Sequence, residues 1–306
     1  MGVVRPPRVT GCWHPGRVGS RVAAVVVAVF VAGCGGGSSS GALRSPARPA
    51  GSAATTAVVP PAPAGSSSVP APPPVTGPAS VAGRLVAVET AIRDRSTPDA
   101  DLAGLGREQQ DLYRLLVRNP DWQATVQGLL PADLRALAGA HVMAGTELRR
   151  LAQPKPELPK WRIVAPGPAG ELLAEYKGAQ SALGVPWQYL AAIHLVETRM
   201  GRIRGDSVAG AQGPMQFIPS TWKVYGNGGD INSDHDSILA AARLLKSRGA
   251  PADMARALYA YNPSQRYVRA VTAYAGVMAA EERAYLAYHG WQVYYGDTLL
   301  PEGYVG

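Results

Sequence analysis

The segment from Gly35 to about Ser80 limits where this 306-residue chain can form a folded core. It consists almost entirely of Gly, Ser, Ala, Pro, Thr and Val, and Arg44 and Arg48 are its only charged residues. Such a composition buries too little apolar surface to offset the entropy lost on folding, and its proline runs favour extended polyproline II. We therefore expect a semi-stiff spacer over residues 34–81, followed by a folded part of about 220 residues.

The sequence before the spacer is typical of a secretion signal. Four arginines precede an eleven-residue apolar run, Val22 to Ala32, which is too short to span a bilayer as an ordinary helix. The run is followed by Gly33-Cys34, and the four residues that end in this cysteine resemble the bacterial lipobox, in which the cysteine is acylated. We expect residues 1–33 to be removed and Cys34 to anchor the protein to the cell membrane, on its extracytoplasmic face. An ordinary cleavage site beside an accidental cysteine is the alternative.

Cleavage before Cys34 would change the charge and the cysteine content of the protein. Residues 1–33 hold four of the 30 basic residues and none of the 22 acidic ones, so the formal net charge falls from +8 to +4. A mildly basic chain without a Lys/Arg cluster does not indicate nucleic acid as a partner, and it suits contact with an anionic cell wall. The only cysteines are Cys12 and Cys34, so disulfides and thiolate metal sites are excluded from the folded part.

Residues 82–152 form a candidate accessory region. Leucines recur there at near-helical spacing, which predicts two to four packed helices. Asn119-Pro120-Asp121 is a favourable helix start, with a cap, a proline at the first position and an acid in the first turn. His141 lies on the apolar stripe, where we expect a hydrogen-bonded core histidine rather than a ligand. No motif in this region indicates catalysis or identifies a partner.

A proline-rich stretch, Pro154–Pro159, breaks any helix and marks a boundary. A second helical region follows and extends to about residue 288. Its helices are expected to begin near Ala169, Pro186, Ser237, Pro251 and Ser264. Between Gly201 and Asp236 one glycine-rich, irregular segment is expected, and such segments often carry sites.

Glu197 lies in the last turn of the helix expected from Pro186, which is apolar on nearly every side and which Gly201 is placed to end. Apolar surroundings disfavour the charged form of this carboxyl, and so does the negative end of the helix dipole. Both effects raise the pKa of Glu197 toward the range of a general acid near neutral pH. The alternative is a structural ion pair with an arginine that follows it: Arg199, Arg202 or Arg204.

The sequence that follows favours catalysis over an ion pair. From Gly210 to Trp222 it is GAQGPMQFIPSTW, a long string of unusual composition. Gly210 and Gly213 permit a tight backbone path close to a ligand, and Gln216 offers an amide suited to sugar hydroxyl and acetamido groups.

With this string and the later pair Tyr261-Asn262, the chain resembles the lytic transglycosylases of the lysozyme-like superfamily, over roughly residues 170–280. The QFIPS portion is similar to the membrane-bound B-type branch, and the short distance from Glu197 to Ser207 is similar to the soluble-type, SLT-like branch. Thr198 stands where the soluble-type branch usually has serine, and a hydroxyl is retained there.

The resemblance implies a mainly α fold, with a lysozyme-like catalytic domain over residues 160–290, preceded by the helical accessory region and followed by a C-terminal tail, residues 291–306. It implies cleavage of peptidoglycan between N-acetylmuramic acid and N-acetylglucosamine, with Glu197 as the single acid and base. The muramoyl C6 hydroxyl would then close a 1,6-anhydro ring. The implied substrate-binding residues are Ser207, Gln216, Tyr261, Asn262 and Tyr267. Neither a cofactor nor a metal is implied, and plain packing is the alternative for the tyrosines.

Three alternatives concern acids and activity. Asp206 is the nearest carboxyl that would make the protein a muramidase, although a solvated loop charge is expected there. The alternating acids Asp230, Asp234 and Asp236 are similar to the start of an EF-hand, but the glycine and the bidentate glutamate of that loop are missing. We expect Asp236 to cap a helix that begins at Ser237, and cation binding stays open. A catalytically inactive lipoprotein that binds glycan or a wall-synthesis partner is the rival function.

Overall fold

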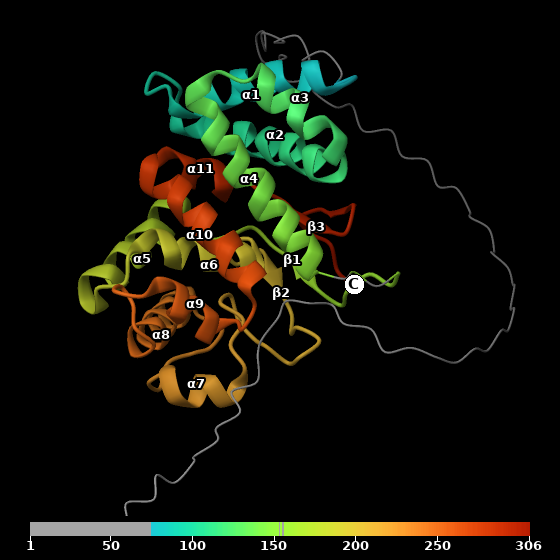
Figure 1. The fold of residues 1–306 in the computed structure, drawn as a ribbon. Coiled ribbons are helices and arrows are strands. Elements are labelled where there is room, and N and C mark those ends of the chain that lie inside the picture. Colours follow the sequence, from blue (N-terminus) through green and yellow to red (C-terminus); the bar gives the residue numbers. More distant parts are fainter. Residues whose placement is uncertain (1–74, 153, 155) are drawn as a thin grey trace, which may run out of the picture.

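The computed structural model describes residues 75–306 except 153 and 155, so Cys34, the expected signal and most of the spacer lie outside the described residues. Over this part the protein is mainly α-helical, as expected, with 63% of residues in helices (Figure 1). Eleven helices and two short two-stranded sheets make up the described ranges. None of these helices is long and apolar enough to cross a membrane.

Four helices form the accessory region: α1 (Pro78–Arg93), α2 (Asp99–Arg118), α3 (Pro120–Leu129) and α4 (Ala132–Leu151). Helix α1 begins four residues before the expected boundary at 82, because the Ser80 hydroxyl accepts a hydrogen bond from the Gly77 backbone N–H at 3.1 Å and holds the first turn. Helix α3 begins at Pro120 as expected. The Asn119 side chain does not cap it, however, and donates back to the Leu115 carbonyl oxygen at 2.8 Å.

Seven helices follow: α5 (Ala169–Leu183), α6 (Trp187–Thr198), α7 (Pro219–Tyr225), α8 (Asp234–Ser247), α9 (Met254–Tyr261), α10 (Gln265–Ala280) and α11 (Arg283–His289). The expected starts of α5, α6 and α10 are confirmed to within one residue. The expected starts of α8 and α9 are three residues late and three residues early, and α7 lies within the segment expected to be irregular. Asp236 does not cap α8, because the Ser233 hydroxyl does so by accepting from the Asp236 N–H at 3.2 Å.

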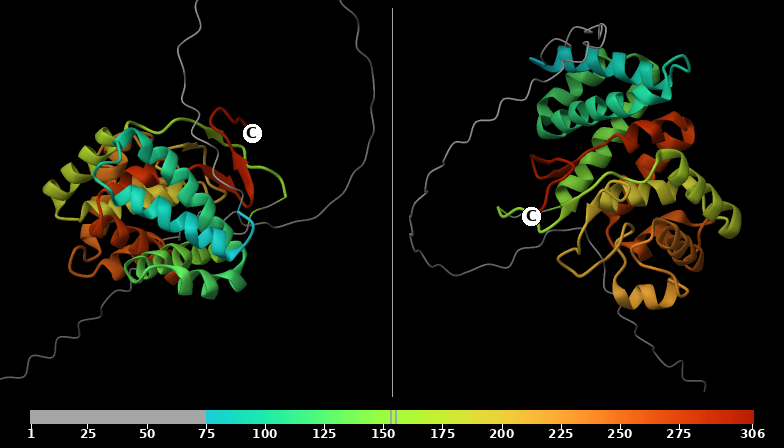
Figure 2. Two further views of the ribbon diagram at one scale, coloured as in Figure 1. Left: turned by 90° about the horizontal axis from the view of Figure 1, so that it is seen from above. Right: turned by 180° about the vertical axis from the view of Figure 1, so that it is seen from behind.

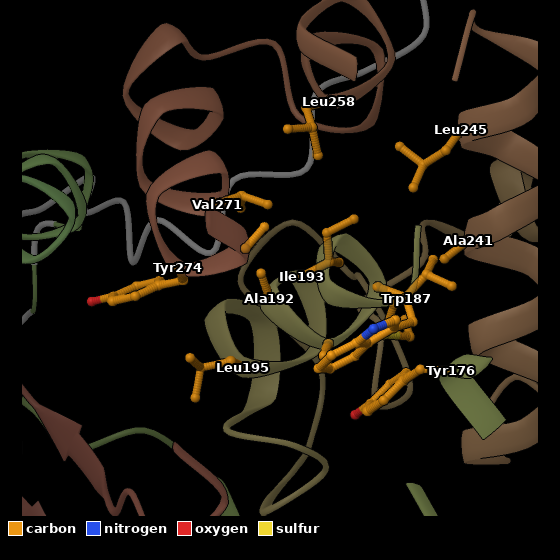
Figure 3. Packing of buried hydrophobic residues seen from close by; sticks show 14 of the residues in the cluster. Tyr176, Trp187, Ala192, Ile193, Leu195, Ala241, Leu245, Leu258, Val271 and Tyr274 are labelled. Carbon is orange, nitrogen blue, oxygen red and sulfur yellow. The ribbon is translucent and has the colours of Figure 1, made fainter. Parts of the chain in front are cut away.

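Helix α6 lies at the centre of the larger core. It is apolar on nearly every side, and a helix of that kind must be covered all round. Figure 3 shows Ile193 and Leu195 of α6 among side chains from α10 and α8, including Val271 and Ala241. The last turn of α6, which carries Glu197, is therefore held from several directions.

The accessory helices pack tightly on the C-terminal helices. Helix α4 lies along α10 and α2 lies against α11, so that the red C-terminal elements stand between the first four helices and the rest (Figures 1 and 2). Ala144 of α4 belongs to the larger core, and Ala287 of α11 belongs to the core of the accessory helices. At Gly106 the backbones approach so closely that a Cβ atom would lie 1.9 Å from the Ala287 carbonyl oxygen.

The C-terminal tail is an ordered part of this packing. Strand β1 (Arg162–Ile163) pairs with β2 (Ile203–Arg204), and β3 (Val293–Tyr295) pairs with β4 (Thr298–Leu300), both in antiparallel fashion. The β3–β4 hairpin docks on α2, where Gln110 Nε2 donates to the Gln292 carbonyl oxygen at 2.9 Å and the Gln292 N–H donates to Gln110 Oε1 at 2.8 Å.

Candidate active site

Helix α6 ends at Thr198, one residue after Glu197, and an unusual run of backbone conformations follows. Arg199, Met200 and Gly201 have φ values of 54°, 58° and 81°, all in the left-handed region. Only Gly201 was expected to end the helix, and a left-handed residue with a side chain costs about 1–2 kcal/mol. Such conformations persist only where the surroundings fix them, and they gather at functional sites.

The Glu197 carboxyl is buried, with 2% of the residue exposed. Its Oε1 atom accepts a hydrogen bond from the Tyr267 hydroxyl at 2.8 Å, whereas Oε2 has no hydrogen-bond partner among the described residues. Burial raises the pKa of Glu197 to about 8, and the hydrogen bond from Tyr267 opposes this rise. The carboxyl thus keeps its proton at neutral pH.

The alternative of a structural ion pair is wrong for the described part of the chain. Arg199 donates to a main-chain carbonyl oxygen of α6. Arg202 pairs with Glu302 at 3.7 Å, and Arg204 lies 3.9 Å from Asp234. No cation of the described residues lies within ion-pair distance of Glu197.

Two tyrosines adjoin the carboxyl. The rings of Tyr261 and Tyr267 are parallel, with centroids 6.3 Å apart, and Tyr267 contacts Glu197 directly. The Tyr261 hydroxyl donates to the Met215 carbonyl oxygen at 2.6 Å, and burial raises the pKa of both tyrosines well above the ordinary value. Both therefore stay neutral donors. Asn262, the next residue, is buried at the C-terminal end of α9.

Hydroxyl groups hold the glycine-rich loop against the end of α6. The Thr198 hydroxyl donates to the Pro214 carbonyl oxygen at 2.6 Å, one residue before the carbonyl that Tyr261 holds. Gly213 has a φ of 73°, and a Cβ atom there would lie 1.9 Å from the Ile231 carbonyl oxygen. Gln216 is buried with a φ of 51°, and its Nε2 donates to the Gly213 carbonyl oxygen at 3.0 Å.

Ser207 and Asp206 lie at the start of this loop. The Ser207 hydroxyl accepts from the Ala211 N–H at 3.0 Å, so it closes the loop on itself. Asp206 is exposed and accepts from Gln212 Nε2 at 3.2 Å. The structure thus brings Tyr267 and Tyr261 to Glu197, but it gives neither Ser207 nor Gln216 a hydrogen bond to the acid.

Glu197 also lines a cavity of about 550 Å³. On the side that carries Glu197, the cavity is lined by Val196, Arg199 and Tyr274. The opposite wall comes from α2, α4 and the β3–β4 hairpin, and none of the five expected substrate-binding residues lines it. This wall is not predictable from the sequence, because its residues come from segments about 180 positions apart, such as Arg114 and Gly296.

The acidic segment before α8 is used within its own loop. Asp236 Oδ2 accepts from the Asp230 N–H at 3.0 Å, and Asp230 Oδ1 accepts from the Asn232 N–H at 2.9 Å. Asp234 lies 3.5 Å from His194, whose pKa burial lowers to about 3. Among residues 75–306 as far as they are described, no group of three His, Cys, Asp or Glu is placed to hold a metal ion.

His141 is a core residue, as expected. It is 1% exposed, stacks on Tyr113 at 4.2 Å between ring centroids, and is hydrogen-bonded to the Tyr288 hydroxyl at 2.8 Å.

Comparison with known proteins identifies the central part of the chain. Residues 176–283 match the family model described as Transglycosylase SLT domain. No curated protein and no solved structure matches the chain at a significant level. The matched range contains Glu197, the glycine-rich loop, Tyr261 and Tyr267, and it leaves α1–α4 and the β3–β4 hairpin outside. The chain therefore carries a transglycosylase SLT domain, a domain of the lysozyme-like superfamily that acts on peptidoglycan.

Proposed function

We propose that this protein is a peptidoglycan lytic transglycosylase that cleaves the β-1,4 bond between N-acetylmuramic acid and N-acetylglucosamine. Glu197 acts as the single general acid and base. The observation that carries the proposal is the state of this carboxyl within the SLT domain: it is buried, its pKa is raised to about 8, and its Oε2 has no partner in the described part of the chain.

Each oxygen of Glu197 has a separate role in the proposed reaction. Tyr267 donates to Oε1, so the proton belongs on Oε2. That proton passes to the glycosidic oxygen while the bond from muramoyl C1 to this oxygen breaks, and the bonding pair leaves with N-acetylglucosamine. The carboxylate then takes the proton of the C6 hydroxyl as O6 bonds to C1. The hydrogen bond from Tyr267 stabilises the carboxylate between the two transfers.

A single carboxyl suffices because the substrate supplies its own nucleophile, which is already tethered at high effective concentration. Hydrolysis would call for a second carboxyl as nucleophile or as the base that activates water. Asp206 is the candidate nearest in sequence, and its exposure and its bond to Gln212 fit a solvated loop charge.

Mass spectrometry of the muropeptides released from purified sacculi tests the reaction. The released fragments should end in 1,6-anhydromuramic acid. Asp206→Asn serves as the matched control and should release the same anhydro products. Fragments with reducing ends only, lost in Asp206→Asn, would identify a muramidase instead.

We also propose that Cys34 carries lipid and holds the protein on the extracytoplasmic face of the cell membrane. The apolar run before this cysteine and the uncharged Gly/Ser tract after it support the proposal. Cys34→Ala should give unprocessed or aqueous-phase protein in detergent phase partition, whereas Cys12→Ala should behave like the wild type. Wild-type protein in the aqueous phase, without an acyl mass on Cys34, would contradict the anchor.

A further inference from the structure

The cavity beside Glu197 has a wall that the SLT domain does not supply. Residues of α2 and α4 and the β3–β4 hairpin form this wall, all outside residues 176–283. Three of its side chains are guanidinium groups: Arg114 and Arg118 of α2 and Arg149 of α4. We call these three residues the arginine wall.

The arginine wall carries more positive charge than its one acidic partner can offset. Arg114, Arg118 and Arg149 lie 3.6, 3.4 and 3.3 Å from the same oxygen atom, Oδ1 of Asp297. One carboxylate therefore faces three cations. Arg199 adds a fourth cation from the α6 side of the cavity, and its buried Nε has no hydrogen-bond partner in the described part of the chain.

The three arginines differ in how firmly they are held. Arg114 is fixed, because its guanidinium donates to the Gly296 carbonyl oxygen at 2.9 Å and lies 3.5 Å from the ring centroid of Tyr294. Arg118 and Arg149 have exposed side chains, and among the described residues Asp297 is the only carboxylate within ion-pair distance of either. Each of these two side chains can therefore rotate so that two guanidinium N–H groups point toward a ligand in the cavity.

A surplus of guanidinium groups beside a catalytic acid is suited to an anionic part of the substrate, because guanidinium binds a carboxylate through two parallel hydrogen bonds. The amino-sugar rings of the glycan are neutral, and where a peptide is attached to the lactyl group of N-acetylmuramic acid, the carboxylates lie on that peptide. We propose that the arginine wall binds a carboxylate of this stem peptide, so that the accessory region and the hairpin select peptide-bearing strands. This inference rests on the proposed function for the identity of the substrate.

A binding experiment tests the inference without depending on catalysis. The probe is the disaccharide N-acetylglucosaminyl-N-acetylmuramic acid, which lacks the bond that the enzyme is proposed to cleave. It is used with a tetrapeptide stem, with the same stem after amidation of its carboxyl groups, and without a peptide, in which case the lactyl carboxyl of N-acetylmuramic acid is capped as its amide. Calorimetric titration of the intact chain should show that the carboxylate-bearing probe binds about tenfold or more tightly than the other two, the size expected for one charge-assisted contact.

The variants assign that preference to the arginine wall. Arg118→Gln/Arg149→Gln should weaken binding of the carboxylate-bearing probe about tenfold and leave binding of the peptide-free probe unchanged. Arg107→Gln is the matched control, because Arg107 is an exposed arginine of α2 that does not line the cavity. It should leave the binding of all three probes unchanged.

Equal binding of the three probes by the wild type would overturn the inference, and so would a loss in the double variant that is the same with and without the peptide. Failure of this inference and failure of the proposed function would give different results. Release of anhydro muropeptides without a peptide preference would overturn the arginine wall alone. A peptide preference without any cleavage would support the arginine wall and contradict the proposed reaction.

Discussion

At the scale of the residue, burial of Glu197 links its proposed role as general acid to the stability of the fold. Its pKa rises from the ordinary value of 4.5 to about 8 in the fold. Between these two values the folded protein holds the proton and the unfolded chain has released it. The free energy of unfolding therefore decreases as pH rises through this window, by about 1.4 kcal/mol for each pKa unit.

Glu197→Gln should separate the two effects. Cleavage should fall by at least about 10³–10⁴-fold, because the amide has no proton to deliver and general acid–base catalysis contributes up to that range. The variant should also be more stable than the wild type at pH 8 by roughly 2–4 kcal/mol, with a smaller difference at pH 5, because it has no carboxyl to desolvate. Muropeptide release and thermal unfolding at both pH values measure these outcomes.

Near-wild-type cleavage by a Glu197→Gln protein with a native thermal transition would contradict the role of Glu197. In the wild type, activity should decrease as pH rises through about 8, since the acid is then lost.

The sequence was sufficient to place Glu197 in a buried helix end, because an apolar run and a following glycine are local features. It did not reveal that the hydroxyls of Thr198 and Tyr261 hold consecutive carbonyl groups of the loop, at Pro214 and Met215. Such bonds join segments that become neighbours only after folding. The alternative of an ion pair between Glu197 and a following arginine is wrong for a related reason. The left-handed turn after Thr198 directs these arginines to other partners.

At the scale of the element, helix starts were predictable where one residue type dominates the signal. Pro120 and Ala169 were placed correctly. The start of α8 was not, because Ser233 and Asp236 both have capping side chains and only the folded loop shows that Asp236 instead accepts from Asp230. Helix α7 is only seven residues long, which is too short for an apolar period to stand out in its sequence.

At the same scale, the close approach of α2 and α11 predicts that a side chain added at their contact destabilises the fold. Gly106→Ala should lower the free energy of unfolding by about 1–3 kcal/mol, because its Cβ would displace the Ala287 backbone. Gly104→Ala is the matched control on the same helix, where the nearest atom to an added Cβ is an arginine terminus at 3.8 Å. The control should be neutral or stabilising by up to about 1 kcal/mol, since alanine favours helix. Chemical denaturation measures both, and equal effects of the two substitutions would contradict the packing argument.

At the scale of the whole molecule, the accessory helices and the SLT domain share their packing. Glu147 of α4 is buried and accepts hydrogen bonds from Arg269 at 2.6 Å and Arg266 at 3.4 Å, both on α10. Ala144 and Ala287 each lie in the core of the other part. The sequence predicted both helical regions but not that they pack together. The proline-rich boundary at Pro154–Pro159 is a local signal, whereas the contacts across it join residues that are distant in the sequence.

Shared packing predicts joint unfolding. Scanning calorimetry of the intact chain should give a single transition, with the calorimetric enthalpy equal to the van't Hoff enthalpy. Gly106→Ala should move that whole transition to lower temperature. Two resolved transitions, of which only one responds to Gly106→Ala, would show that the parts unfold independently.

The paired hydrogen bonds between Gln110 and Gln292 have a consequence for the order of events during synthesis. Glu197 and Tyr267 are synthesised before the β3–β4 hairpin. The cavity wall opposite them is complete only after the hairpin has emerged and docked on α2. Such long-range pairing is slow to form. A partly made chain, or one clipped before Val293, would thus carry Glu197 and the three arginines of α2 and α4 without the hairpin residues that complete the cavity, and a single cut near the C-terminus would open the cavity beside the acid.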